Sequence, residues 1–67
     1  MIKVTRINKI EEFYINEDLI EFIEETPDTV ISMESGKKMI VMESAGIIID
    51  RIVSEKRKLH RYWNELK

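Results

Sequence analysis

The chain has 67 residues and no cysteine, which excludes disulfide bonds, thiolate metal ligands and a cysteine nucleophile. Charged residues make up 36% of the chain and hydrophobic residues 43%, a mixture too apolar for disorder and too charged for a membrane protein. The net charge is -2, but residues 1–43 carry ten acidic and five basic side chains whereas residues 44–67 carry three acidic and six basic ones, so the body is acidic and the tail basic.

Two N-terminal segments, residues 1–7 and 12–16, alternate apolar and polar side chains, which is the pattern of a half-buried strand. A short polar connection separates them, so we predict a hairpin. Asn16-Glu17-Asp18 then predicts a turn or one short helical turn that leads into Leu19. No long apolar run of the kind found in a signal peptide follows the N-terminus, and we expect a cytoplasmic protein.

Three further strands are predicted at residues 20–26, 29–34 and 37–43. The first of these also fits a helix on pattern alone, but Thr26-Pro27-Asp28-Thr29 favours a strand because proline and aspartate suit the central positions of a turn. Ser35-Gly36 indicates a hairpin, since glycine readily takes the positive φ of a tight turn.

The sequence period changes after the fifth predicted strand. Ser44 is a good helix N-cap, and we predict a helix from about residue 45 to residue 65. Apolar side chains recur along it at three- and four-residue steps. These residues are Ala45, Ile48, Ile49, Ile52, Leu59, Tyr62, Trp63 and Leu66.

The predicted fold class is α+β: a five-stranded antiparallel meander curled into a small barrel-like sheet, followed by one C-terminal helix. A meander with turns this close together tends to coil. We expect one domain over residues 1–67, with the sheet in 1–43 and the helix in 44–67. The predicted core consists of Ile2, Val4, Phe13, Ile15, Ile20, Phe22, Ile31, Ile40, Met42, Ile48 and Ile52.

The run Met39-Ile40-Val41-Met42 is apolar on both faces of its predicted strand, whereas a half-exposed strand should alternate. We expect both faces to be covered. One interpretation places a barrel interior on one side and the helix on the other, and a second places an oligomer interface there.

No sequence pattern indicates catalysis, a metal or a cofactor. The glycines Gly36 and Gly46 form no glycine-rich phosphate loop. The lone histidine, His60, lies in a charged run and is interpreted as a solvated helix-surface residue. We therefore expect a protein that is not an enzyme, with no catalytic residue, no metal ligand and no cofactor.

The predicted helix is longer than the sheet that it would cover. A helix of about 22 residues spans about 33 Å, whereas strands of about six residues span about 20 Å. Either the helix crosses the sheet diagonally and its far end is core, or the far end contacts another chain, because tryptophan and tyrosine are enriched at interface hot spots. The hypothetical partner-binding residues are Leu59, Tyr62, Trp63 and Leu66, with Arg57, Lys58 and Arg61 as a basic rim. We also expect a homo-oligomer, since small chains without disulfides often gain stability that way.

Several segments carry a family resemblance. They are Met1-Ile2-Lys3-Val4-Thr5-Arg6-Ile7-Asn8, Asn16, Asp18-Leu19-Ile20-Glu21, Ile23-Glu24, Thr26-Pro27-Asp28-Thr29-Val30-Ile31, Gly36-Lys37-Lys38 and Val41-Met42-Glu43-Ser44. Over about residues 1–57 the chain resembles the FlbD/SwrD family of small flagellar proteins. It departs from the family pattern at Lys9, where glycine is usual, and at Ala45-Gly46, where acidic residues are usual.

The resemblance implies a role in bacterial flagellar motility without enzymatic activity. Family genes lie among flagellar genes near those of the motor stators, and swarming-associated members are linked to motor power. The leading hypothesis is a cytoplasmic accessory protein that supports motor power or assembly by protein contact. Its expected partner is a motor or stator component, and an association with the flagellar base is part of this hypothesis.

Two alternatives remain. One is a small nucleic-acid-binding regulator that presents Lys56, Arg57, Lys58 and Arg61 to RNA or DNA, although a net charge of -2 disfavours it. The other is a purely structural homo-oligomer with no outside partner. We expect no nucleic-acid partner and no transmembrane segment, because no apolar run approaches the roughly 20 residues that a spanning helix needs.

Overall fold

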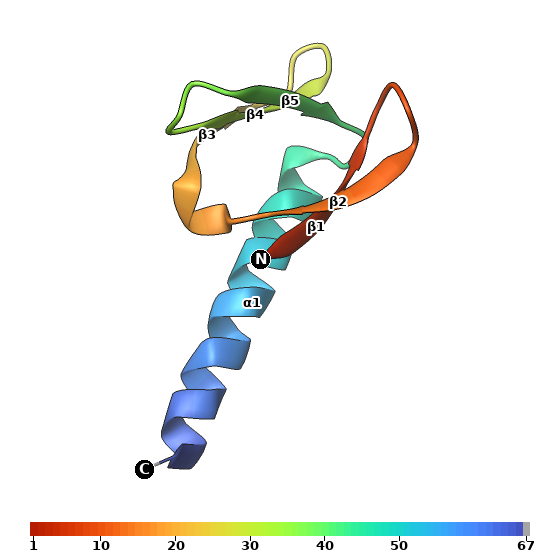
Figure 1. Cartoon of the computed structure of the whole chain (residues 1–67). Helices are drawn as coiled ribbons and strands as arrows, with labels where there is room; N and C mark the ends of the chain where they lie inside the picture. The colour runs from red at the N-terminus through yellow and green to blue at the C-terminus, as the bar shows by residue number, and fades with distance from the viewer. Residues whose placement is uncertain (67) are drawn as a thin grey trace.

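The computed structural model describes the backbone of residues 1–66 and the side chains of residues 1–58. All five predicted strands, the helix and the short helical turn before residue 20 are confirmed, close to their predicted boundaries (Figure 1). The elements are β1 (Ile2–Arg6), β2 (Glu11–Ile15), the 3₁₀ turn η1 (Glu17–Leu19), β3 (Ile20–Glu24), β4 (Thr29–Met33), β5 (Lys38–Val41) and α1 (Ala45–Leu66).

Local side-chain chemistry explains where several elements begin. The Asn16 side chain accepts a hydrogen bond of 3.0 Å from the Asp18 N–H and so caps η1. Gly36 has a φ of 93° in the β4–β5 turn, as the sequence predicts. The hydroxyl of Ser44 accepts a hydrogen bond of 3.3 Å from the Ile47 N–H, which confirms Ser44 as the N-cap of α1.

The β1–β2 turn carries local backbone strain at Ile10. Its φ is 48°, in the left-handed region, where a side chain with a Cβ costs roughly 1–2 kcal/mol. The Ile10 N–H donates to the Arg6 carbonyl at 3.0 Å and closes the turn. Since this turn contains no glycine, a β-branched residue takes the left-handed conformation.

The strands form one antiparallel sheet in the order β2-β1-β5-β4-β3. The prediction of a simple meander is therefore wrong at two places: β2 and β3 do not pair, and β1 pairs with β5 through Arg6 and Val41. The segment Asn16–Leu19 separates β2 from β3, which lie at opposite edges. Because these edges stay unpaired in the described residues, the sheet is open, and the predicted barrel-like closure is wrong.

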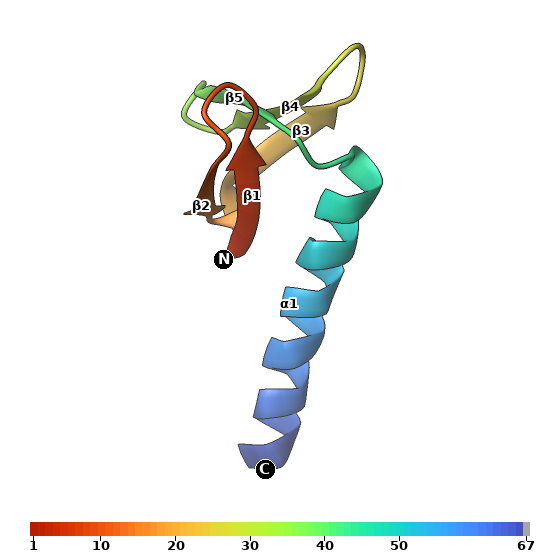
Figure 2. The ribbon, with the colours of Figure 1, turned by 90° about the vertical axis from the view of Figure 1, so that its right-hand side faces the viewer.

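The core lies on one face of this sheet, where the first turns of α1 cover it (Figure 2). Its fully buried members are Ile2, Val4, Ile15, Ile31, Met39, Val41 and Ile48. A half-buried ring packs around them and consists of Phe13, Ile20, Ile23, Met33 and Ile52. These contacts confirm most of the predicted core.

Three predicted core residues are exposed instead: Phe22 at 43%, Ile40 at 41% and Met42 at 56%. In β5 the inward positions are Met39 and Val41, so the residues that alternate with them face outward. In β3 the register shifts between Ile20 and Phe22, which turns the following residue, Ile23, toward the core. The expectation that both faces of β5 are covered is wrong for this chain alone, because core and helix lie on the same side.

Glu43 and Arg51 fasten α1 to β1. The Glu43 carboxylate accepts hydrogen bonds from the Thr5 N–H at 2.9 Å and the Thr5 hydroxyl at 3.0 Å. Arg51 Nη1 lies 2.8 Å from the same carboxylate and 2.6 Å from the Lys3 carbonyl oxygen. Burial alone would raise the pKa of Glu43, but the hydrogen bonds from Thr5 and Arg51 outweigh it and hold the pKa below its ordinary value.

Candidate functional site

The distal half of α1 projects beyond the sheet. In both ribbon views the helix leaves the strands after its first turns and continues alone to the C-terminal end (Figures 1 and 2). The chain is elongated as a result, with extents of 44 × 22 × 18 Å. The interpretation in which the helix crosses the sheet diagonally is therefore wrong.

An ion pair marks where the docked part of the helix ends. Among the described side chains, the most distal ion pair between α1 and the rest of the chain joins Lys56 Nζ to Asp18 Oδ1 of η1 at 3.0 Å. Beyond it, Arg57 and Lys58 are exposed, and Lys58 Nζ lies 3.7 Å from Glu55 of its own helix. We call residues 57–66 the projecting helix end.

Only part of the predicted partner-binding set falls within the described side chains. Arg57 and Lys58 lie on the projecting helix end and are exposed, and Lys58 also lines a shallow hollow with Lys3 and Tyr14 of the sheet. The other candidates belong to the helical backbone of α1, but their side chains lie outside the described residues. These candidates are Leu59, Arg61, Tyr62, Trp63 and Leu66, and the side chain of His60 likewise lies outside the described part.

Exposed carboxylates lie along both edges of the sheet, opposite in sign to the basic residues of the helix. The edge strand β2 begins with Glu11 and Glu12, and Glu12 pairs with Lys3 at 3.3 Å. The other edge strand, β3, contributes Glu21 and Glu24. The acidic body and basic tail inferred from the sequence are therefore separate regions of the folded chain.

Sequence reasoning missed a second apolar surface, on the outward side of the sheet. Ile10, Met42 and Ile47 are exposed and line one shallow hollow with Thr5 and Glu43. Met42 belongs to the run of residues 39–42, which is apolar at every position. Ile40 and Met42 of this run were predicted from the sequence to be core residues, whereas Met39 and Val41 occupy the buried positions.

The described residues contain no cluster of three or more side chains that would hold a metal ion. The perturbed carboxylates are structural: the pKa of Glu17 is lowered by its hydrogen bond with the N-terminal amino group, and Glu43 ties α1 to β1. Among the described residues, no helix is both long enough and apolar enough to cross a membrane. The candidate binding features among the described residues are therefore surfaces: the projecting helix end, the acidic sheet edges and the apolar hollow at Ile10, Met42 and Ile47.

Comparison with known proteins gives one match. The model of a family described as flagellar and swarming motility proteins, FlbD, matches residues 1–60. The match covers the whole sheet and most of α1, including Arg57 and Lys58. Neither the curated proteins nor the solved structures contain a match.

Proposed function

This chain belongs to the FlbD family of flagellar and swarming motility proteins, and on that premise we propose that it is a non-enzymatic accessory protein that acts by protein–protein contact. It supports the power or the assembly of the flagellar motor. Its place is the cytoplasm, at the flagellar base, where a motor or stator component is its partner. The observation that carries the proposal is a helix that projects from a small folded body.

The contact surface is the projecting helix end. Helical spacing brings Leu59, Tyr62 and Leu66 onto the same side as the buried Ile48, so the stripe that packs on the sheet continues past it. Trp63 flanks this stripe. Exposed apolar patches usually mark binding sites, and a central tryptophan is a common anchor of such sites.

Self-association uses the same surface. The exposed cations Arg57 and Lys58 complement the carboxylates at the two sheet edges of a neighbouring copy. Contact between the helix of one copy and the acidic body of the next buries the apolar stripe between charged rims. A domain of this length has a marginal core, so such burial also adds stability.

Paired alanine substitutions on one helix test this proposal. Trp63→Ala with Leu59→Ala should leave the sheet folded, reduce self-association in sedimentation velocity and impair motility in the parent organism. A central aromatic anchor contributes about 2 kcal/mol or more, which corresponds to at least about thirtyfold in affinity.

Ile49→Ala with Val53→Ala is the matched control, because both residues are exposed apolar positions of α1 on its docked half. The control should sediment and swim like the unaltered protein. The proposal fails if the distal double variant is folded by circular dichroism yet associates and swims normally.

A further inference from the structure

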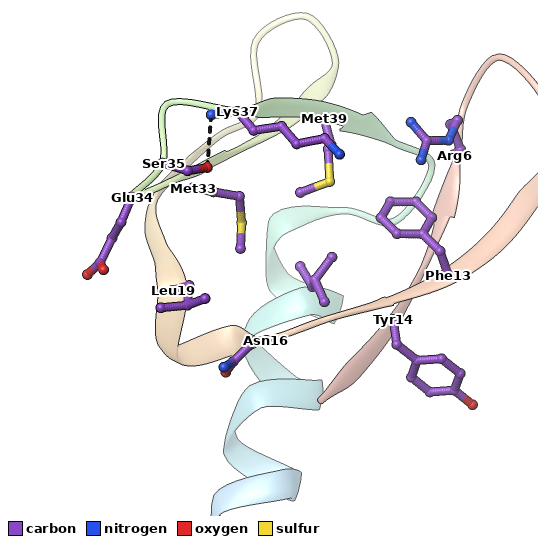
Figure 3. A pocket seen from close by; sticks show the side chains of 11 residues that line it. Arg6, Phe13, Tyr14, Asn16, Leu19, Met33, Glu34, Ser35, Lys37 and Met39 are labelled. Carbon is purple, nitrogen blue, oxygen red and sulfur yellow. Dashed lines mark hydrogen bonds between the residues drawn. The ribbon is translucent and has the colours of Figure 1, made fainter.

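An apolar groove lies where the sheet remains open. It occupies about 530 Å³ between the edge strand β2 and the β4–β5 hairpin, with Leu19 of η1 at one end (Figure 3). Its apolar lining comes from Phe13, Ile15, Leu19, Met33 and Met39. This volume is within the range of about 300–1,000 Å³ that ligand sites occupy.

One wall of the groove is an unpaired strand edge. Within residues 1–66, which the structure describes, the only sheet neighbour of β2 is β1, so alternate backbone N–H and C=O groups of β2 point away from β1 without a partner strand there. Backbone groups at such an edge can pair with an added extended chain, and alternate side chains of that chain then enter adjoining pockets. The groove therefore has both components of a site for strand addition.

Two cations converge at one end of the groove. Arg6 lies with its guanidinium 4.6 Å from the centre of the Phe13 ring. The long side chain of Lys37 runs from the β4–β5 turn toward that same end, whereas Glu34 points away at the other end (Figure 3). Among the described side chains neither cation takes part in an ion pair, even though Glu11 is the strand partner of Arg6.

We propose that this groove binds an extended peptide segment of a protein partner, added as a strand at the β2 edge, with apolar side chains in the groove and an acidic side chain between Arg6 and Lys37. The groove is positively charged at the end with Arg6 and Lys37 and negatively charged at the end with Glu34, and this asymmetry orients the peptide. This site is separate from the projecting helix end, but it shares the β2 edge with carboxylates that the helix of a neighbouring copy would contact.

A peptide fits these features better than a compact ligand does. A small amphipathic acid would use the apolar lining and the cations, but it would leave the backbone groups of β2 unpaired. An extended peptide uses the apolar lining, the two cations and the backbone groups of β2 together. A random octapeptide display library therefore serves as the probe, and it should select sequences with alternating apolar residues and one glutamate or aspartate at a constant position.

Binding of the best selected peptide, followed by fluorescence anisotropy, tests the role of the cations. Arg6→Gln and Lys37→Gln should each weaken it by about tenfold or more, because each removes a charge-assisted contact. Replacing the acidic residue of the peptide with glutamine should abolish most of that difference between variant and unaltered protein. Amide shifts in nuclear magnetic resonance spectra should change along β2 and the β4–β5 turn.

Lys38→Gln is the matched control, since Lys38 neighbours Lys37 but does not line the groove. It should bind the peptide with unchanged affinity. The proposal is overturned if no library peptide binds, if selected peptides lack an acidic residue, if their shifts map elsewhere, or if Lys38→Gln weakens binding as much as Lys37→Gln. Occupation of the groove by octanoate without peptide selection would assign it to a fatty acid instead.

Discussion

At the scale of single residues, Glu43 joins parts of the chain that are distant in sequence. Its carboxylate bonds to Thr5 of β1, which is 38 positions away, and to Arg51 on the second turn of α1. The Glu43 side chain is mostly buried, at 10% exposure, so removing its charge takes away the ionic partner of Arg51 and leaves Arg51 its hydrogen bond to the Lys3 carbonyl. Glu43 is therefore one of several side chains that hold α1 against the sheet, together with the buried Ile48 and the ion pair between Lys56 and Asp18.

The lowered pKa of Glu43 predicts a pH-dependent stability. A carboxyl group with a depressed folded-state pKa contributes stability above its unfolded-state pKa and loses that contribution as the pH falls through the folded-state value. The window therefore begins near the ordinary value of 4.5 and extends below it. Glu43→Gln should cost about 1–3 kcal/mol at pH 7, and the difference from the unaltered protein should shrink below pH 4.5.

Urea unfolding at several pH values measures this difference. Glu21→Gln is the control, since Glu21 is an exposed carboxylate on the edge strand β3. It should leave the free energy of unfolding nearly unchanged at pH 7. A constant difference between Glu43→Gln and the unaltered protein across the whole acid range would contradict the assigned role of the charge.

The role of a residue could be predicted from the sequence only when its hydrogen-bond partner lies close to it along the chain. Ser44 and Asn16 bond to backbone groups two or three positions away, so residue type and position were sufficient. Glu43 gave no such signal, because its partners lie in other elements. Arg6 and Lys37 were likewise missed as a pair, since only the folded sheet brings them to the same end of one groove.

At the scale of the elements, the strand boundaries followed from turn chemistry, but the faces of two strands did not. Proline, glycine and asparagine lie in the connections that follow the ends of the first four strands. In β5 the residues that follow Lys38, from Met39 to Val41, are all apolar, so their side chains give no preference between the two faces. In β3 the register shift after Ile20 reverses the face expected from simple alternation. The pairing of β1 with β5 is nonlocal and leaves no local sequence pattern.

The corrected faces predict unequal stability losses for substitutions on the two neighbouring strands β3 and β4. Ile31 on β4 is fully buried, so Ile31→Ala should destabilise the protein by about 2–5 kcal/mol. Phe22 on β3 is 43% exposed, so Phe22→Ala should cost about 1 kcal/mol or less. Thermal or urea unfolding of both variants gives the comparison. An equal or larger cost at Phe22 would show that the outward assignment of this residue is wrong.

At the scale of the whole molecule, a small sheet carries a long helix that extends beyond it. The body is acidic along both sheet edges, and the described part of the projecting helix end presents Arg57 and Lys58. The length of the helix predicted that about 22 helical residues exceed the width of such a sheet, but the sequence left open whether the helix crosses the sheet diagonally or extends beyond it. The open sheet could not be predicted, because it results from the pairing of β1 with β5 and from the lack of pairing between β2 and β3.

Photo-crosslinking in swimming cells tests the central claim, that the projecting helix end is the contact surface, most directly. A photoreactive phenylalanine analogue replaces Trp63 in one variant and Ile49, an exposed residue of the docked half of α1, in a control variant. We predict that illumination links the Trp63 variant to a second copy of the chain or to a flagellar motor or stator protein, and that the Ile49 variant gives no such product. Equal crosslinking from both positions, or none from position 63 in cells that swim normally, would contradict the account.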